Sequence, residues 1–185
     1  MSVHLTFDVV DIELNAGELG EGFAQLVERA DRESLHADVG EYMLNATDAR
    51  FEAERAPDGT AWAPLSPATL ISQYESRGKT KRALKQRTRG GDISVTAGFA
   101  RFLQAKKILQ DKGTRGGLRG DVSYEADGDA VRLGVSKVYG RIHQLGGEAG
   151  RGVVLPARPF LGVSDDDELV IGDIVRRWAR EELGR

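Results

Sequence analysis

Residues 118–135, LRGDVSYEADGDAVRLGV, decide the fold class, because two short β-prone runs flank an Asp-Gly pair at 127–128. An Asp-Gly pair between two such runs is a strong signal for a β-hairpin. Val131, Leu133 and Val135 alternate along the second run, so one face of that strand should be buried. The stretch therefore predicts antiparallel strands packed against other parts of the chain.

Amphipathic helical patterns precede this hairpin. A stripe of apolar residues starts after Asn15 and reaches Ala30. A second helix is predicted from an N-cap at Ser34 to about Arg55. The two segments can also form one long helix that is interrupted near Asp31.

Other elements are predicted on both sides of these segments. Partly alternating β-branched residues predict a strand over 3–13, and apolar spacing predicts a helix over 95–111. Proline at the first helical position favours a short helix over 67–74, and residues 138–145 should form a short helix or turn. Ser164 should cap a final helix with acidic residues in its first turn. Its expected buried face consists of Val170, Ile171, Ile174, Val175 and Trp178.

These patterns place the chain in the α+β class, with long helices packed on a small antiparallel β-sheet and with extended arms. A length of 185 residues fits a single domain over residues 1–185. Within it, residues 77–92 are expected to form a flexible basic loop or arm.

Composition excludes several classes of site. The chain has no cysteine, so disulfides, thiolate zinc sites and cysteine nucleophiles are excluded. Its three histidines are too scattered to suggest a metal site, and no apolar run approaches the roughly 20 residues that span a bilayer. The N-terminus lacks the pattern of a secretory signal. We therefore expect a protein made in a cytoplasm, with no metal, cofactor or membrane contact.

Charge is concentrated in one segment although the net charge is only −3. Residues 77–89, RGKTKRALKQRTR, carry seven basic residues and no acidic one. These are Arg77, Lys79, Lys81, Arg82, Lys85, Arg87 and Arg89. The segment is either a solvated loop or a cationic arm that contacts nucleic acid or an acidic neighbouring subunit.

No catalytic constellation is visible in the sequence. The acidic run 165–168 lacks the alternating ligand spacing of a calcium loop, and the glycine-rich stretch 113–120 lacks the spacing of a phosphate-binding loop. His143 has no serine or carboxylate motif that would make it a general base, so a structural hydrogen bond is its expected role. The sequence therefore predicts no enzyme.

Three stretches, read together, carry a family resemblance. They are DGTAWAPLSPAT at 58–69, YGRIHQLGG at 139–147 and PARPFLG at 156–162. In this order they resemble the signature of the phage virion morphogenesis family, whose prototype is a tail-completion protein of Mu-like phages. The resemblance covers roughly residues 15–183. Residues 77–106 look expanded beside the family pattern, Gly140 replaces the usual alanine, and the strand at the N-terminus is unusual.

The resemblance implies a non-enzymatic structural protein of a tailed phage or prophage, with a fold like that of tail-completion or neck proteins. Such proteins complete tails or join tails to heads, as subunits that form rings. Expected partners are further copies of the chain and other tail or head-connector proteins, with DNA as a possible contact of the basic segment, and the expected location is the virion. The expected interface or structural residues are Trp62, Pro64, Leu65, His143, Gln144, Gly146, Gly147, Arg158, Pro159 and Phe160.

Two of these residues have more specific expected roles. Trp62 can lie in the core or at an interface between subunits. Arg158 stands between an alanine and a proline, so its guanidinium should be fixed and able to bind a carboxylate bidentately.

Overall fold

A computed structural model of the chain describes residues 3–7, 32–86, 93–110 and 117–183. Strands β1 (Val3–Phe7), β5 (Val131–Val135) and β4 (Val122–Ala126) form an antiparallel sheet in the order β1-β5-β4. Tyr124 lies opposite Leu133 in the register of the β4–β5 hairpin. This hairpin confirms the prediction from the Asp-Gly turn. The N-terminal strand is confirmed over residues 3–7, and the remainder of its expected range lies outside the described residues.

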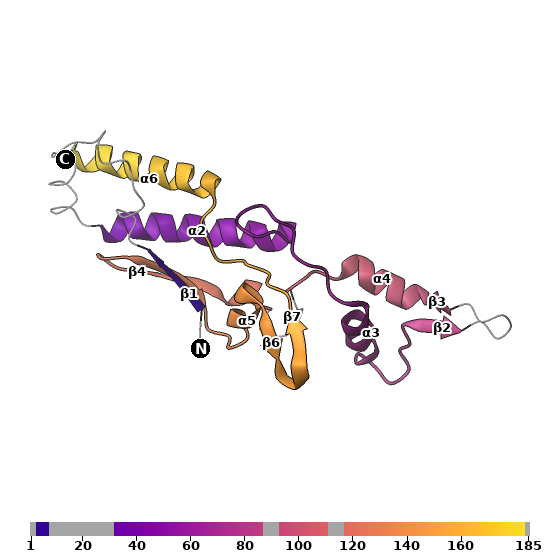
Figure 1. Cartoon of the computed structure of the whole chain (residues 1–185). Coiled ribbons are helices and arrows are strands. Elements are labelled where there is room, and N and C mark those ends of the chain that lie inside the picture. Colours follow the sequence, from indigo (N-terminus) through magenta and orange to yellow (C-terminus); the bar gives the residue numbers. More distant parts are fainter. Residues whose placement is uncertain (1–2, 8–31, 87–92, 111–116, 184–185) are drawn as a thin grey trace.

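Two long helices lie on one side of the sheet, as Figure 1 shows. Helix α2 (Glu33–Ala53) covers the β4–β5 hairpin, and helix α6 (Asp165–Leu183) packs along α2. Gly40 makes the close approach possible, because a Cβ at this position would lie 2.3 Å from the Tyr124 ring. The three layers confirm the predicted α+β class.

The main core lies between these layers. Side chains from α2, β5 and α6 are almost completely removed from water, which is the dominant favourable term in folding. Its main members are Leu35, Val39, Met43, Phe51, Val131, Leu133, Val135, Ile171, Val175 and Trp178.

Two predictions about helix ends and faces were wrong. Ser34 is not the N-cap of α2, because Arg32 occupies that position with helical backbone angles and no side-chain cap. Val170 is 38% exposed because it lies one residue before the buried Ile171, which turns it away from the core face. The predicted cap of α6 is confirmed, since Ser164 Oγ accepts a hydrogen bond from the Asp167 amide at 3.2 Å. The helix expected over residues 16–30 lies outside the described residues.

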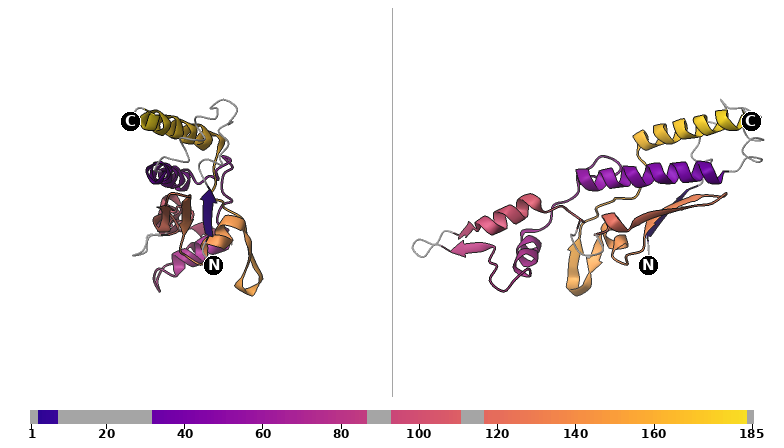
Figure 2. Two further views of the ribbon diagram at one scale, coloured as in Figure 1. Left: turned by 90° about the vertical axis from the view of Figure 1, so that its left-hand side faces the viewer. Right: turned by 180° about the vertical axis from the view of Figure 1, so that it is seen from behind.

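A second, smaller unit extends from one end of the layers (Figures 1 and 2). We call residues 67–105 the arm lobe. It contains α3 (Pro67–Glu75), the antiparallel pair β2 (Leu84–Gln86) and β3 (Ile93–Val95), and α4 (Ala97–Ala105). Its own small core consists of Tyr74, Ala83, Phe99 and Phe102.

The arm lobe confirms one helix prediction and shortens the other. The helix predicted from residue 67 is confirmed, with Ser66 as its N-cap. Helix α4 is shorter than the predicted 95–111, because the backbone is extended at Lys106 and Leu109 has a positive φ of 58°.

The remaining described elements directly precede β4 or follow β5 along the chain. A short 3₁₀ turn (Arg119–Asp121) leads into β4, and α5 (Gly140–Leu145) follows β5, as predicted. Strands β6 (Gly147–Ala149) and β7 (Val153–Leu155) form an antiparallel hairpin around a 3₁₀ turn (Gly150–Gly152). This hairpin projects away from the sheet in Figure 1.

Candidate functional site

The three sequence motifs meet at one place beside the C-terminal half of α2. We call this place the motif junction, and it comprises residues 62–65, 143–147 and 158–160. The first segment is positioned by the tight turn that ends α2. In it Ala56 donates a backbone hydrogen bond to Thr60 at 2.8 Å, and Gly59 adopts a φ of 78°. The turn returns the chain along the end of α2, where the Trp62 amide donates to Glu54 O at 2.8 Å.

Trp62 lies in the core of the single chain, with 6% of its surface exposed. Its ring meets the edge of Phe51 at a centroid distance of 5.3 Å, and Phe51 in turn lies 5.4 Å from Phe160. The indole Nε1 donates to Pro159 O at 2.7 Å. The aromatic group thus joins α2, the first motif and the last motif, and Leu65 packs against the same core.

Arg158 differs from its predicted role. The residue is 3% exposed, and its guanidinium donates to two backbone carbonyls, Ala63 O at 2.7 Å and Pro64 O at 3.1 Å, and to no carboxylate of the described residues. Its amide donates to His143 O at 2.7 Å. Prolines in the first motif lack an amide hydrogen and favour an extended chain. The carbonyls of this motif therefore have no helical partners, and they serve as the acceptors for Arg158. Burial lowers the pKa of Arg158 below its usual range.

Gln144 fixes the last motif to α5. Its Oε1 accepts from the amides of Phe160 and Leu161, each at 3.0 Å, and its Nε2 donates to Leu161 O at 2.7 Å. A single side-chain amide therefore satisfies three backbone groups of an irregular, buried segment.

Gly146 and Gly147 allow the chain to turn from α5 into β6. Gly146 has a φ of 70°, and a Cβ there would lie 2.8 Å from the Ala157 amide nitrogen. Gly147 has a φ of 135°, which side chains rarely tolerate. The glycine pair is thus required by backbone conformation and, at Gly146, by close packing.

His143 lies in the same junction but carries no catalytic arrangement. Its ring stands edge-on to Tyr139 at 6.1 Å, and its buried Nδ1 has no hydrogen-bond partner among the described residues. The structural hydrogen bond expected of the His143 side chain remains a prediction. Burial and the nearby Arg158 charge lower the pKa of His143.

The sequence interpretation missed a buried ion pair that supports the junction from below. Arg50 donates to Gly162 O at 2.7 Å and is paired with Asp167, and both side chains are buried. Asp167 also accepts from Tyr42 Oη at 2.9 Å and from the Ser164 amide at 2.7 Å, and the Tyr42 pKa rises to about 12 because of burial and this carboxylate. Local signals mark each of the two residues, although not their pairing. Arg50 follows Met43 by seven residues on the apolar face of α2, and Asp167 follows Ser164 by three, as in a capping box.

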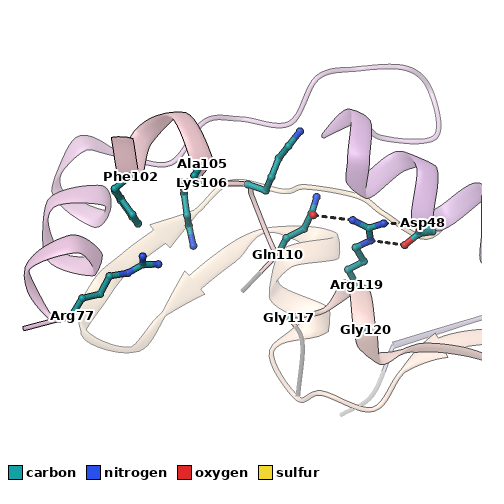
Figure 3. Close-up of a pocket in the computed structure, with 10 residues that line it drawn as sticks. Asp48, Arg77, Phe102, Ala105, Lys106, Gln110, Gly117, Arg119 and Gly120 are labelled. Atoms are coloured by element: carbon teal, nitrogen blue, oxygen red, sulfur yellow. Dashed lines mark hydrogen bonds and ion pairs between the residues drawn. The ribbon is translucent and has the colours of Figure 1, made fainter. Parts of the chain in front are cut away.

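The arm lobe and the layered body are separated by a cleft of about 450 Å³, shown in Figure 3. Arg119 lies at the body side and binds Asp48 at 2.5 Å and Gln110 Oε1 at 3.1 Å, as well as Glu52. Arg119 holds the pKa of Asp48 below its usual range. On the lobe side, the Arg77 guanidinium lies 4.6 Å from the centre of the Phe102 ring. The cleft is therefore lined by cations that already have partners in the chain.

Part of the basic segment is folded into the arm lobe, and several of its side chains are exposed to solvent. Lys81 lies 5.6 Å from the centre of the Tyr74 ring, and the segment expected to be a loop contains β2 at residues 84–86. Lys79, Lys81, Arg82 and Lys85 are exposed, and none of them forms an ion pair with a described residue. Arg87 and Arg89 lie outside the described residues. No hydrogen bond or ion pair joins the described part of the segment to the motif junction.

Within the described residues, no group of three acidic or histidine side chains is arranged to hold a metal ion. No described helix is long and apolar enough to cross a membrane. The motif junction instead uses its polar side chains on backbone carbonyls and amides. Chemically, this arrangement holds irregular segments in fixed positions.

Comparison with known proteins agrees with the motifs that form this junction. The sequence pattern of the phage virion morphogenesis family matches residues 14–101 and 97–180. The chain belongs to the phage virion morphogenesis family. The match is divided inside α4, which lies within the range 77–106 that looked expanded from the sequence.

Two proteins of Haemophilus influenzae are similar to this family member. "Mu-like prophage FluMu G protein 1" is 26% identical over 172 residues, which cover 93% of this chain and 96% of that protein. "Mu-like prophage FluMu G protein 2" is 42% identical over 53 residues, which cover 28% of this chain and 38% of that protein. No solved structure matches the chain. The family membership gives the protein a structural role in the assembly of phage virions, alongside other virion proteins.

Proposed function

We propose that this protein is a non-enzymatic structural subunit that acts in tail completion or head–tail joining, and that it works as a ring of identical copies. Membership of the virion morphogenesis family supports the assembly role, and the relative that matches along nearly its whole length is named as a protein of a Mu-like prophage. The narrower step and the ring are our proposal.

The observation that carries the non-enzymatic role is the use of the motif side chains. Arg158, Gln144 and Trp62 each donate to or accept from backbone groups of another motif. An enzyme places nucleophiles, bases or metal ligands where a substrate can reach them. Here the residues that carry the family signature fix backbone segments relative to one another, which suits a subunit that must present a rigid surface.

Two projecting hairpins support the assembly role (Figure 1). Strands β2–β3 and β6–β7 each form a two-stranded sheet whose outer edges pair with no other described strand. Ile93, Val95, Val153 and Val154 are more than half exposed. Unpaired strand edges with apolar side chains are suited to contacts with neighbouring subunits.

Electron microscopy of particles induced from a prophage that lacks this gene tests the proposal. Filled heads beside unattached tails, or tails of irregular length, are expected, and a plasmid copy of the wild-type gene should restore whole particles. Normal, infectious tailed particles without the gene would rule out the proposed step.

Nucleic-acid binding by the basic segment is the second candidate. It is supported by the exposed cations Lys79, Lys81, Arg82 and Lys85, which have no ion pair within the described residues. Such binding to a DNA duplex should weaken steeply as salt rises, because bound phosphates release counterions. Fluorescence anisotropy with a labelled duplex at several salt concentrations tests it, and affinity that does not change with salt would exclude this mode. The two functions are compatible if the arm lobe faces a channel that contains DNA.

A further inference from the structure

The outward face of α6 has an acidic first half with exposed apolar side chains. Leu169 is 66% exposed and Val170 is 38% exposed, although both lie in a helix that packs on the body through its other face. Asp165, Asp166 and Glu168 beside them are exposed and form no ion pair with a described residue. Among the described residues, these two apolar side chains and three carboxylates of α6 therefore have no partner.

The tip of the arm lobe has the opposite charge and the same mixture of groups. Ile93 is 68% exposed, Val95 is 52% exposed, and Leu84 of the paired strand is 41% exposed. The nearby exposed cations are Lys79, Lys81, Arg82 and Lys85. A two-stranded hairpin is only marginally stable alone, and all three residues of β3 are exposed. The tip thus has the properties of a surface that is completed by another molecule.

The two surfaces cannot meet within one chain. In Figures 1 and 2 the β2–β3 tip lies beyond the far end of α2, while α6 lies over the opposite half of the body. Neither surface is therefore covered by the other within one copy.

We infer that the β2–β3 tip of one copy docks on the outward face of α6 of the next copy. Ile93, Val95 and Leu84 would cover Leu169 and Val170, and the cations of the tip would face the three carboxylates of α6. Complementary charge around an apolar centre fixes orientation and suppresses wrong partners. Nucleic-acid binding would account for the cations of the tip but not for its composition as a whole, because it would leave the three apolar side chains exposed.

This contact is head-to-tail, since it joins two different surfaces of the same chain. A head-to-tail contact generates a ring when its rotation closes. The inference rests on the ring proposed above and supplies the surfaces that form it.

Cross-linking tests the contact, and the absence of native cysteine gives a background without other thiols. Ile93→Cys protein is mixed with Leu169→Cys protein and treated with a short bis-maleimide, both as purified full-length chains and in extracts of induced cells. We expect a dimer only in the mixture, and a ladder of products from the double variant. The matched control pairs Ile93→Cys with Val154→Cys, which is as accessible at 75% exposure but should give no dimer.

Charge reversal distinguishes a specific contact from cross-linking by random collision. Replacing Lys79, Lys81 and Arg82 by Glu should reduce the Ile93–Leu169 cross-link at least tenfold, and replacing Asp165, Asp166 and Glu168 by Lys in the partner should restore it. Circular dichroism shows that each variant is folded before it is used.

The outcomes discriminate between the alternatives. A cross-link to Val154 in place of Leu169, or no cross-link in either the purified protein or the extracts, would overturn the inference. Loss of duplex binding in the arm variant without any cross-link would assign the tip to nucleic acid instead. Separate heads and tails in the deletion strain would still support the proposed function in both cases.

Discussion

The motif junction and the arm lobe are built in opposite ways. The junction contains Trp62 and Arg158, both almost fully buried, and each forms a directed hydrogen bond across more than 90 residues of sequence. The arm lobe is stabilised by a small, mainly aromatic cluster whose members all come from the lobe itself. Its tip exposes apolar side chains beside cations. We therefore interpret the motif junction as complete in one chain and the lobe tip as a surface that is completed during assembly.

The largest expected effect comes from removing Arg50, which supports the junction. Arg50→Met leaves the Asp167 carboxylate buried without its cationic partner, which should lower the free energy of unfolding by about 3–5 kcal/mol. Urea denaturation followed by tryptophan fluorescence measures it. The control is Arg176→Met, which breaks the exposed pair with Asp173 and should cost at most about 1 kcal/mol. Equal losses in the two variants would contradict the account of the buried pair.

A smaller loss is expected from Gln144→Ala. The amides of Phe160 and Leu161 lose their shared acceptor, and an unsatisfied buried donor costs about 1–3 kcal/mol. We therefore expect a loss of about 2–3 kcal/mol in the same denaturation experiment. Gln104→Ala, at an exposed position of α4, should change stability by less than about 0.5 kcal/mol. A neutral Gln144→Ala variant would show that the last motif holds its position without α5.

Phe102→Ala should separate the lobe from the body. Phe102 contacts Tyr74 and Phe99, so its removal opens the lobe core while the core of the body keeps its contacts. We expect amide protection against hydrogen exchange to fall in α3 and α4, and the main unfolding transition to shift by less than about 1 kcal/mol. A cooperative loss across α2 and α6 would show that the two regions fold as one unit.

The smallest effect concerns pH. Because the His143 pKa is lowered in the fold, the neutral form is favoured there, and the unfolded chain binds a proton first as pH falls. This contribution to stability is fully present above the unfolded value of about 6.5 and is lost as pH falls from there through the folded pKa. His143→Gln should therefore flatten the pH dependence of the denaturation midpoint below pH 6.5. An unchanged pH profile would assign the acid sensitivity to other groups.

Local patterns were sufficient for most of the fold. The Asp-Gly turn gave the β4–β5 hairpin, Ser164 gave the start of α6, and Pro67 gave the start of α3. These signals depend on residues that are close in sequence, so they do not require knowledge of the tertiary contacts. Their physical basis is a backbone preference or a single capping hydrogen bond.

The sequence did not predict which residues far apart in the chain contact each other. The motifs pointed to Trp62 and Arg158, but not to the carbonyls that they bind, because those acceptors are backbone groups that any residue could supply. The Arg50–Asp167 pair joins residues 117 positions apart, and nothing local connects them. The division of the chain into body and lobe also depends on tertiary packing. Helix α4 ends at Ala105, although its apolar pattern continues to Leu109.

The most direct test of this division places an altered lobe tip in the phage itself. Lys79, Lys81 and Arg82 are replaced by Glu in the prophage gene, and induced particles are examined by electron microscopy while the amount of the soluble variant is measured by quantitative mass spectrometry. The account predicts a protein that accumulates at the wild-type level beside filled heads and unattached or irregular tails. Normal numbers of infectious particles, with the variant protein present, would contradict it.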